Sequence, residues 1–578
     1  MSSLPPVPSL SFSLFTPPTT RFGPRLGTIR FKRPEGAEIQ IQTPGFLTSA
    51  SRGVVPHLSR DHYAESSIRW VNLPFESFLD VPPPVPTLVP GKNPLHSFLG
   101  YSLGQHVVSM SARDPADGRE MPANGNTHVS TYSLRGVRKI TPADWRSYVL
   151  SCKPDIVFAL SDIPFTNPPY SQKRLTKSIE RSASWLANIL SPPTHTSTYA
   201  LSEGEYKPNI LIHMAGAASV PARRAFASSL VEKLLGPEAD AIKPLETLDQ
   251  GVFGYTFDLV PIRLSLEAAE KQHQDPFYSP VESLPQTPPS AADANSNSNS
   301  TSTPSSEVNL DPVIPAHTDQ LTPLLHASLE PLPVEKMRLV NTVQTPHEVL
   351  RLISTVGIDI FDAHWAQRAA DIGVALDFTF PAPSSSSSSS ISSTATKTRD
   401  NGKHDIGHNL YSDSYTHDFS SFSATPCECR ACTPIAPSTR IYHGIDDPSY
   451  SNEEPAASSV REKPSFTRAY IHHLLHTHEM SAHSLLVMHN LGVLDTFFAS
   501  IRRIIQRDME AQIKGSEVEG GEWEEEVRRF EEYYDESLVV FEEARVMWRD
   551  VDLARGRGRL KREKKRQEEG TLGTAVEL

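Results

Sequence analysis

The strongest constraint on this chain is a cluster of three cysteines, Cys427, Cys429 and Cys432, in a sequence that has only four. A C-x-C-x-x-C spacing brings three thiolates onto one tight turn, which suits three corners of a tetrahedral zinc site. The fourth cysteine, Cys152, lies far upstream and is typical of a buried thiol. We therefore expect a histidine as the fourth ligand, and segment 466–492 offers several. A metal-free thiol cluster or a disulfide is the alternative.

Composition narrows the class of protein. The chain has 68 acidic and 55 basic residues, for a net charge of −13, which argues against a generally basic nucleic-acid coat but permits a local basic patch. The few, clustered cysteines indicate a reducing compartment. No run of about 18 apolar residues occurs, so we predict no integral membrane segment. Residues 1–34 lack acidic side chains and faintly resemble a transit peptide. We favour the alternative that residues 1–20 form a disordered tail.

Strand-like and helix-like segments alternate through most of the chain. Thr141-Pro142 is typical of a helix start, and Thr345-Pro346-His347-Glu348 resembles a capping box. Such alternation predicts an α/β fold with a parallel sheet, either a barrel or a doubly wound sheet. The expected strands span 27–31, 38–45, 105–110, 155–160, 209–216, 251–259, 337–343 and 358–362, and the expected helices span 142–152, 171–191, 220–235 and 346–357.

Low-complexity stretches interrupt this pattern. Residues from about 276 to 318 are poor in apolar side chains and are expected to be disordered. Residues 381–425 form a second low-complexity insert, and a Pro/Ser-rich insert covers 433–464. The tail 506–578 is highly charged and ends in a basic run at 555–566, either a solvated tail or an auxiliary RNA contact or import signal. Part of this tail is predicted to pack its apolar face on another protein surface, in this chain or in a partner. The apolar residues at helical spacing are Trp523, Val527, Phe530, Tyr534, Leu538 and Phe541.

The cysteine cluster, the segment Arg468–Leu474 (RAYIHHL) and the pair His489-Asn490 together resemble the zinc subdomain of the tRNA-guanine transglycosylases. The resemblance implies one Zn²⁺ per chain, held by Cys427, Cys429, Cys432 and His489. It leaves the other five histidines of the segment on a helix surface or at an interface. It also implies a (β/α)8 TIM-like barrel over residues 21–380, with an inserted zinc-binding subdomain and closing helices at 426–505, disordered inserts and a charged helical tail.

The catalytic branch of that family places its nucleophile in a G-[IV]-D-x-F-D motif, and Gly357–Asp362 matches it, so Asp362 stands at the nucleophile position. The D-S-G-G-F-Q motif that supplies a second carboxylate is missing, with Asp114 as the nearest stand-in. The purine-reading aspartate aligns with Ser161, and Asp162 comes one position late, where we expect its side chain to point away. The glutamine of the base pocket aligns with Ala215.

The scaffold and the zinc site are thus kept while the base pocket is lost, and this pattern resembles the non-catalytic accessory branch of the family, as does segment 51–62 (SRGVVPHLSRDH). The resemblance implies support for the exchange of guanine for queuine at the wobble position of tRNAs with GUN anticodons. It implies tRNA and a catalytic queuine tRNA-ribosyltransferase subunit as partners, in a heterodimer. It also implies a cytoplasmic location with peripheral association at the mitochondrial outer membrane. The alternatives are an active transglycosylase that uses Asp362 with Asp114, and a zinc-binding adaptor unconnected with base exchange.

Segment Arg468–Ile505 is expected to form much of the heterodimer interface, because it carries more apolar groups than one helical stripe requires. These groups are Tyr470, Ile471, Leu474, Leu475, Met480, Leu485, Leu486, Met488, Phe497 and Phe498. The alternative is that all of them pack inside a two-helix subdomain. Expected tRNA contacts are Arg468, Arg502, Arg503 and the basic run from Arg555.

Overall fold

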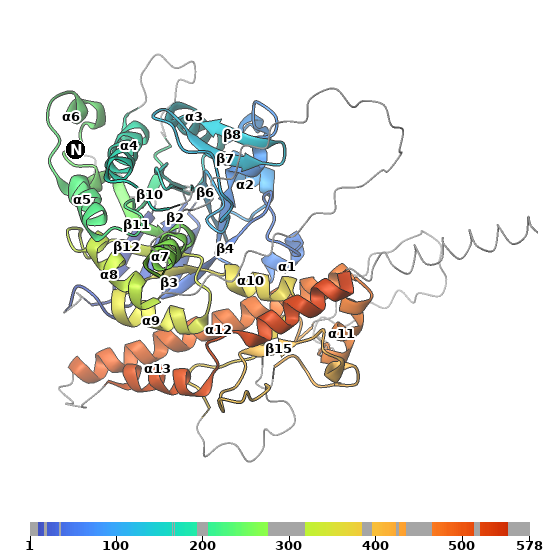
Figure 1. Cartoon of the computed structure of the whole chain (residues 1–578). Helices are drawn as coiled ribbons and strands as arrows, with labels where there is room; N and C mark the ends of the chain where they lie inside the picture. The colour runs from blue at the N-terminus through green and yellow to red at the C-terminus, as the bar shows by residue number, and fades with distance from the viewer. Residues whose placement is uncertain are drawn as a thin grey trace, which may run out of the picture.

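Eight parallel strands form a closed barrel (Figure 1). The computed structural model describes residues 10–16, 20–33, 36–164, 166, 168–192, 206–274, 318–383, 396–423, 427–434, 465–513 and 521–552. The expected barrel, which the alternation alone could not distinguish from a doubly wound sheet, is confirmed. Its strands are, in order around the barrel, β4 (Gly45–Ser49), β5 (Trp70–Pro74), β6 (Val107–Ser111), β9 (Ile156–Phe158), β10 (Asn209–His213), β11 (Val252–Asp258), β12 (Met337–Asn341) and β13 (Ile360–Asp362).

Helices connect the strands and surround the barrel. They are α1 (Arg60–Ala64), α2 (Pro94–Leu99), α3 (Pro142–Cys152), α4 (Gln172–Leu190), α5 (Val220–Val231), α6 (Gly236–Ile242), α7 (Leu259–Gln274), α8 (Thr318–Leu329), α9 (Pro346–Val356) and α10 (His364–Asp371). The α3 start is as predicted, since Thr141 and Asp144 form a capping box. At α9 the Thr345 hydroxyl caps the helix at Glu348 N, but the Glu348 carboxylate bonds to Gln344 N, so the box is only half formed.

Helix α5 ends at Val231, four residues before its predicted end. The backbone turns extended at Glu232, and the N–H of Leu234 bonds to the carbonyl of Glu246 at 3.0 Å. Gly236 and Pro237, read from the sequence as a helix stop, instead begin α6, where a proline in the first turn costs no hydrogen bond.

A three-stranded antiparallel sheet covers the N-terminal end of the barrel: β1 (Leu10–Leu14), β2 (Gly27–Lys32) and β3 (Glu38–Thr43). Strand β1 lies within the tail predicted to be disordered, and its buried Leu10 pairs with Phe31. Two buried ion pairs fasten the sheet to the barrel. Arg25 binds Asp359 just before β13, and Arg33 binds Asp155 just before β9. A separate hairpin, β7 (Val129–Ser133) with β8 (Gly136–Ile140), lies beside α3 (Figure 1).

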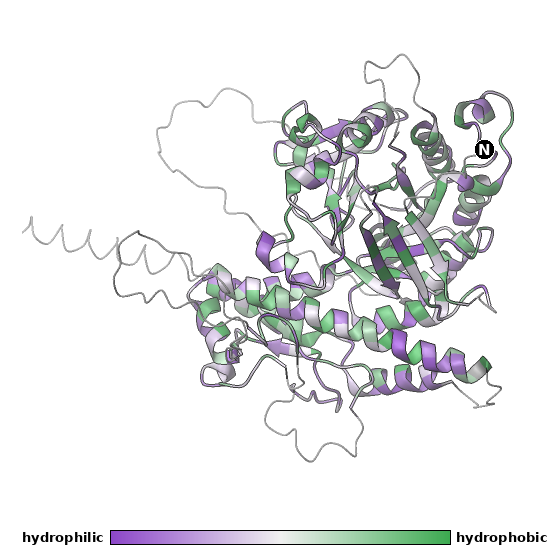
Figure 2. Ribbon diagram, turned by 180° about the vertical axis from the view of Figure 1, so that it is seen from behind, coloured by the Kyte–Doolittle hydropathy of each residue, from purple (hydrophilic) through white to green (hydrophobic). Residues whose placement is uncertain are grey.

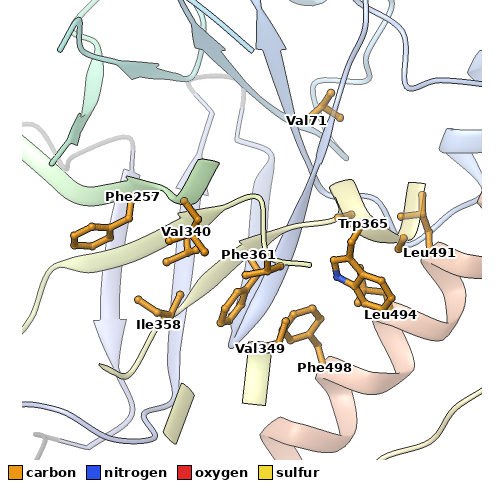
Figure 3. Close-up of a cluster of buried hydrophobic side chains, with 14 of the residues drawn as sticks. Val71, Phe257, Val340, Val349, Ile358, Phe361, Trp365, Leu491, Leu494 and Phe498 are labelled. Carbon is orange, nitrogen blue, oxygen red and sulfur yellow. The ribbon is translucent and has the colours of Figure 1, made fainter. Parts of the chain in front are cut away.

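The C-terminal part packs along one side of the barrel. It comprises β14 (Val374–Leu376), β15 (Gly407–Asn409), the 3-10 turn η5 (Asp413–Tyr415), α11 (Arg468–His476), α12 (Met480–Ile513) and α13 (Glu522–Tyr533). Helix α12 packs against β4 and α10 on this side of the barrel. There Phe498 of α12 stacks on Phe361 of β13, with ring centroids 5.8 Å apart (Figure 3). By length and composition, Met480–Ala511 could cross a membrane, but 67% of its most apolar window is buried in this fold, as in a core helix.

The charged tail docks on its own chain. Trp523, Phe530 and Tyr534 are buried against Phe378, Phe380 and Phe497, which explains their helical spacing. A further helical stretch follows at 539–552. Figure 2 shows mixed hydrophobic and hydrophilic residues along α12 and α13. The predicted disordered insert at 276–318 lies almost wholly outside the described residues, and the basic run at 555–566 lies entirely outside them.

Two other expectations differ from the structure. Residues 396–423, within the segment expected to be a low-complexity insert, include β15 and the buried Ile406, Leu410 and Phe422. Of the ten apolar residues assigned to a partner interface, eight are buried within the chain, and Tyr470 and Met480 are 44% and 76% exposed. This segment has many apolar residues because α12 packs against several elements of its own chain at once: β4, α10, β14, α11 and α13.

Candidate metal centre and candidate active site

Cys427, Cys429, Cys432 and His489 meet in one cluster, as the sequence predicted. The His489 Nδ1 atom lies 3.8, 3.8 and 3.4 Å from the three sulfur atoms, in that order. A tetrahedral zinc ion with Zn–S near 2.3 Å and Zn–N near 2.0–2.1 Å would set these separations at about 3.6 Å. All four cysteines of the chain are free thiols, so the disulfide alternative fails. The four side chains therefore fit a metal ion.

The local sequence builds this cluster from a tight turn and a helix. The backbone N–H groups of Cys432 and Thr433 both bond to the Cys429 carbonyl, and the Thr433 hydroxyl bonds to the Cys427 carbonyl at 2.9 Å. Gly492, one turn after His489 on α12, lets the turn approach the helix, because a Cβ there would lie 2.9 Å from the Cys429 Cβ.

His489 and Asn490 explain the H-N pair in physical terms. His489 Nε2 donates to the Leu376 carbonyl at 2.8 Å, which fixes the tautomer and directs Nδ1 at the cysteines. Asn490 is buried and pairs with backbone polar groups of β14 and α10. Its amide accepts from Leu376 N and donates to the carbonyls of Val374 and Ala366. The two residues thus lock α12 onto β14 beside the metal centre.

The electrostatics of the cluster favour a cation at its centre. Hydrogen bonds from Cys429 and Cys432 lower the pKa of the Cys427 thiol. Burial acts to lower the pKa of His489, but the hydrogen bonds that its Nδ1 donates to Cys427 and Cys429 outweigh it and raise the pKa to about 10. A metal ion would replace that buried proton and neutralise the thiolates.

Asp362 lies at the C-terminal end of β13, where the family motif placed it, and its side chain is buried. Its Oδ2 accepts a hydrogen bond from Thr342 N at 2.7 Å, and Oδ1 has no hydrogen-bond partner among the described residues. Burial, together with the nearby charges of Asp114 and Asp258, raises its pKa to about 8. The carboxyl group is therefore mainly protonated at neutral pH.

Other acidic groups at the barrel mouth surround Asp362. Asp114, the proposed stand-in for the second carboxylate, lines a cavity of about 40 Å³ together with Ser161, His213 and Asp258. Such a space suits a few ordered waters. Asp258 accepts a hydrogen bond from Asn341 at 2.7 Å and lies 3.2 Å from His213. Sequence reasoning missed Asp258 and His213, and their position at the ends of neighbouring predicted strands was the available signal.

Glu76 is a further buried acid at this end of the barrel that sequence reasoning missed. It accepts hydrogen bonds from the backbone N–H groups of Asp114 and Tyr132. Burial raises its pKa to about 8, despite the bond from Asp114. Glu76 therefore holds the loop that carries Asp114 and adds little negative charge at neutral pH.

The position that should read the purine edge is filled by Ser161, whose hydroxyl lies 3.0 Å from that of Ser182. Asp162 is fully buried in a separate ion cluster. It binds Arg174 at 2.7 Å and Arg181 at 2.9 Å, and Asn124 donates to it at 2.8 Å. The one-residue shift thus turns this carboxylate away from the cavity, as expected. The pair Ala215-Gly216 lines an adjoining small pocket, which also contacts Asp258.

The three arginines expected to contact tRNA differ in how far their side chains are exposed to solvent. Arg468 is 2% exposed and pairs with Asp418 at 3.3 Å, so it stabilises α11 and does not face an RNA. Arg502 donates to the Pro44 carbonyl at 2.7 Å and is mostly buried. Arg503 is exposed on α12. Of these three, only Arg503 has the exposure that a phosphate contact needs.

Comparison with known proteins agrees with this arrangement. The family model described as queuine tRNA-ribosyltransferase matches residues 21–241 and 313–517. A Schizosaccharomyces pombe protein named queuine tRNA-ribosyltransferase accessory subunit 2 is 23% identical over 495 residues, which cover 86% of this chain and 79% of that protein. A protein of the same name from Drosophila virilis is 23% identical, covering 84% and 87%. Another, from Trichoplax adhaerens, is 31% identical over 29% of this chain and 43% of its own length. The chain belongs to the queuine tRNA-ribosyltransferase family.

Proposed function

We propose that this chain is the non-catalytic subunit of a heterodimeric queuine tRNA-ribosyltransferase. It would support the exchange of guanine for queuine at the wobble position of tRNAs with GUN anticodons. The observation that carries the proposal is the state of Asp362, which keeps the nucleophile position but is buried with a raised pKa. The names of the relatives support the same assignment.

A carboxylate nucleophile must be ionised and must meet its substrate in attack geometry. The carboxyl of Asp362 is held neutral by burial, and the two base-reading positions carry Ser161 and Ala215. A pocket without its hydrogen-bonding groups has little affinity or discrimination for a purine. The chain can therefore keep the barrel of the family without its chemistry.

The heterodimer partner is the catalytic queuine tRNA-ribosyltransferase subunit, which supplies the working pocket. This chain would then contribute phosphate contacts and orientation to the bound tRNA, since such contacts position a nucleic acid without reading its sequence. Eight of the ten apolar residues in Arg468–Ile505 are buried within this chain and are not exposed for contact with that subunit.

The metal centre is proposed to hold one Zn²⁺ per chain in a structural role. Four protein ligands fill a tetrahedral site and leave no open position for an activated water. The site joins the cysteine turn to α12, and Arg430 in that turn reaches Glu65 after α1 at 3.0 Å. The ion would thus stabilise the side of the barrel on which α12 packs.

The family resemblance extends the proposal to a cytoplasmic location with peripheral association at the mitochondrial outer membrane. Fractionation with a salt wash and a carbonate wash tests this. A peripheral protein leaves the membrane fraction in either wash, and a protein that resists both contradicts the proposal.

The main test is co-purification with the catalytic subunit from the same organism, followed by exchange of labelled guanine for queuine in tRNA. We expect exchange only when both chains are present, and no covalent tRNA adduct on this chain alone. An adduct or exchange by this chain alone would establish the alternative in which Asp362 acts with Asp114. A failure to bind the catalytic subunit would favour the adaptor alternative.

A further inference from the structure

A second cluster of metal-ligating side chains lies apart from the cysteine turn. Asp413 in η5 and the pair His472 and His476 in α11 present one ligand atom each, and these three atoms lie within 4.8 Å of one another. The two histidines are one helical turn apart, a spacing that places them on the same face. Their ring centroids are 4.2 Å apart.

Hydrogen bonds orient both imidazoles as they do in metal sites. His472 Nδ1 donates to the Leu410 carbonyl at 2.9 Å, and His476 Nδ1 donates to the His472 carbonyl at 3.0 Å. Each ring then carries its lone pair on Nε2. The Thr416 hydroxyl lies 3.3 Å from His472 Nε2, but it donates its single proton to the Asp413 carbonyl at 2.7 Å. The His472 lone pair is thus available to a cation. A backbone carbonyl behind each ligating histidine is a common feature of protein metal sites.

The protonation and exposure of the cluster also suit a metal. His472 is buried, and the hydrogen bond from its Nδ1 to the Leu410 carbonyl leaves Nε2 as the nitrogen that can bind an ion. Asp413 and His476 are exposed, so an ion can enter from solvent without opening the fold. Two imidazoles and one carboxylate form a donor set that Zn²⁺ and neighbouring transition cations accept.

We propose that Asp413, His472 and His476 form a second, exchangeable site for Zn²⁺ or a similar divalent transition cation, with water on the remaining position. Its three ligands are fewer and harder than the Cys3His set, so its affinity is lower. The bound ion would tie the segment around η5 to α11. That segment lies within the stretch expected from the sequence to be low-complexity insert, and a metal clip would add to the contacts that already join it to α11, such as the Arg468–Asp418 ion pair.

The test measures Zn²⁺ bound to the full chain, already loaded at its cysteine site, by equilibrium dialysis and elemental analysis over a range of free zinc. We expect wild type to take up a second ion, and His476→Ala and Asp413→Ala to bind it about tenfold or more weakly, since even supporting residues of metal sites cost that much. Both substitutions are at exposed positions, so folding should be retained, which circular dichroism checks.

His473→Ala is the matched control, because His473 is an exposed neighbour on α11 outside the cluster. It should leave the second ion in place. The proposal is overturned if wild type binds no second ion at millimolar free zinc. Equal binding by wild type and His476→Ala overturns it as well, and so does equal loss of the ion in His473→Ala.

Discussion

Asp362 Oδ2 accepts a hydrogen bond from the backbone N–H of Thr342 at 2.7 Å, while its other carboxyl oxygen has no partner among the residues that the structure describes. One hydrogen bond does not offset the burial of a charge, and the pKa rises to about 8. The family's nucleophile position is thus occupied by a carboxyl group that is mostly protonated under physiological conditions.

This state predicts a pH-dependent stability difference between wild type and Asp362→Asn. The folded pKa lies above the unfolded value near 3.9, so between these values the folded state binds more protons and wild-type stability falls as pH rises. Each pH unit in this window costs wild type up to about 1.4 kcal/mol. Chemical denaturation at pH 5 and pH 8 measures the free energy of unfolding of both proteins. The stability of Asp362→Asn relative to wild type should be greater at pH 8 than at pH 5. A constant difference would contradict the raised pKa.

The same substitution separates the two catalytic hypotheses. Because an asparagine side chain resembles a protonated carboxyl, Asp362→Asn should leave exchange by the reconstituted complex within about twofold of wild type, whereas loss of a nucleophile costs orders of magnitude. Initial rates with labelled queuine measure this. The corresponding substitution in the catalytic subunit is the positive control, and a hundredfold loss from Asp362→Asn would assign the chemistry to this chain.

Asp162 should matter for stability and not for base exchange. Its buried carboxylate neutralises Arg174 and Arg181, so Asp162→Ala leaves two partly buried cations unpaired. Removing one member of a buried ion pair costs about 3–5 kcal/mol, and the partial exposure of both arginines puts the expected loss at the low end. Urea denaturation measures it. An unchanged midpoint, or lost exchange in a complex that remains folded, would contradict this structural role.

The sequence predicted much of the scaffold. Strand-helix alternation indicated the parallel sheet, the family resemblance selected the barrel, and the cysteine spacing with the H-N pair located the metal cluster. These signals are local, because a spacing or a periodicity stands within a few residues of the chain. Asp258 and His213 gave no such local signal, since they come from different strands and meet only when β10 and β11 pair side by side.

The failures have related causes. Arg468 looked available to RNA, but Asp418, fifty residues earlier, pairs with it, and Asp377 lies nearby. The apolar surplus of α12 looked like a partner interface because one helix was expected to face one core, whereas it faces several neighbouring elements. The pKa of Asp362 depends on burial, which no motif encodes. In each case the deciding contact joins residues that are distant in sequence.

The cysteine cluster predicts that Cys429→Ser loses the metal. A serine hydroxyl is a poor zinc ligand, and three remaining ligands hold the ion much less tightly, so zinc content should fall from about one per chain toward zero. Cys152→Ser is the matched control, because Cys152 is a free, buried cysteine outside the cluster. Elemental analysis after gel filtration measures both variants, with the second site stripped by a weak chelator. Full zinc in Cys429→Ser would refute the ligand assignment.

Arg503 offers the sharpest test of direct tRNA contact. It is exposed on α12, whereas Arg502 beside it is bound to the Pro44 carbonyl and would report on folding instead. If Arg503 contacts a phosphate, Arg503→Ala should weaken tRNA binding by the complex and reduce the slope of log affinity against log salt by about 1. Filter binding at several salt concentrations measures this slope. Arg507→Ala is the matched control, since Arg507 is exposed one turn later on the same helix and already pairs with Glu522 at 3.1 Å. If the affinity of Arg503→Ala for tRNA is unchanged at low salt, α12 does not contact tRNA. The α12 face of this chain would then serve to stabilise the catalytic partner.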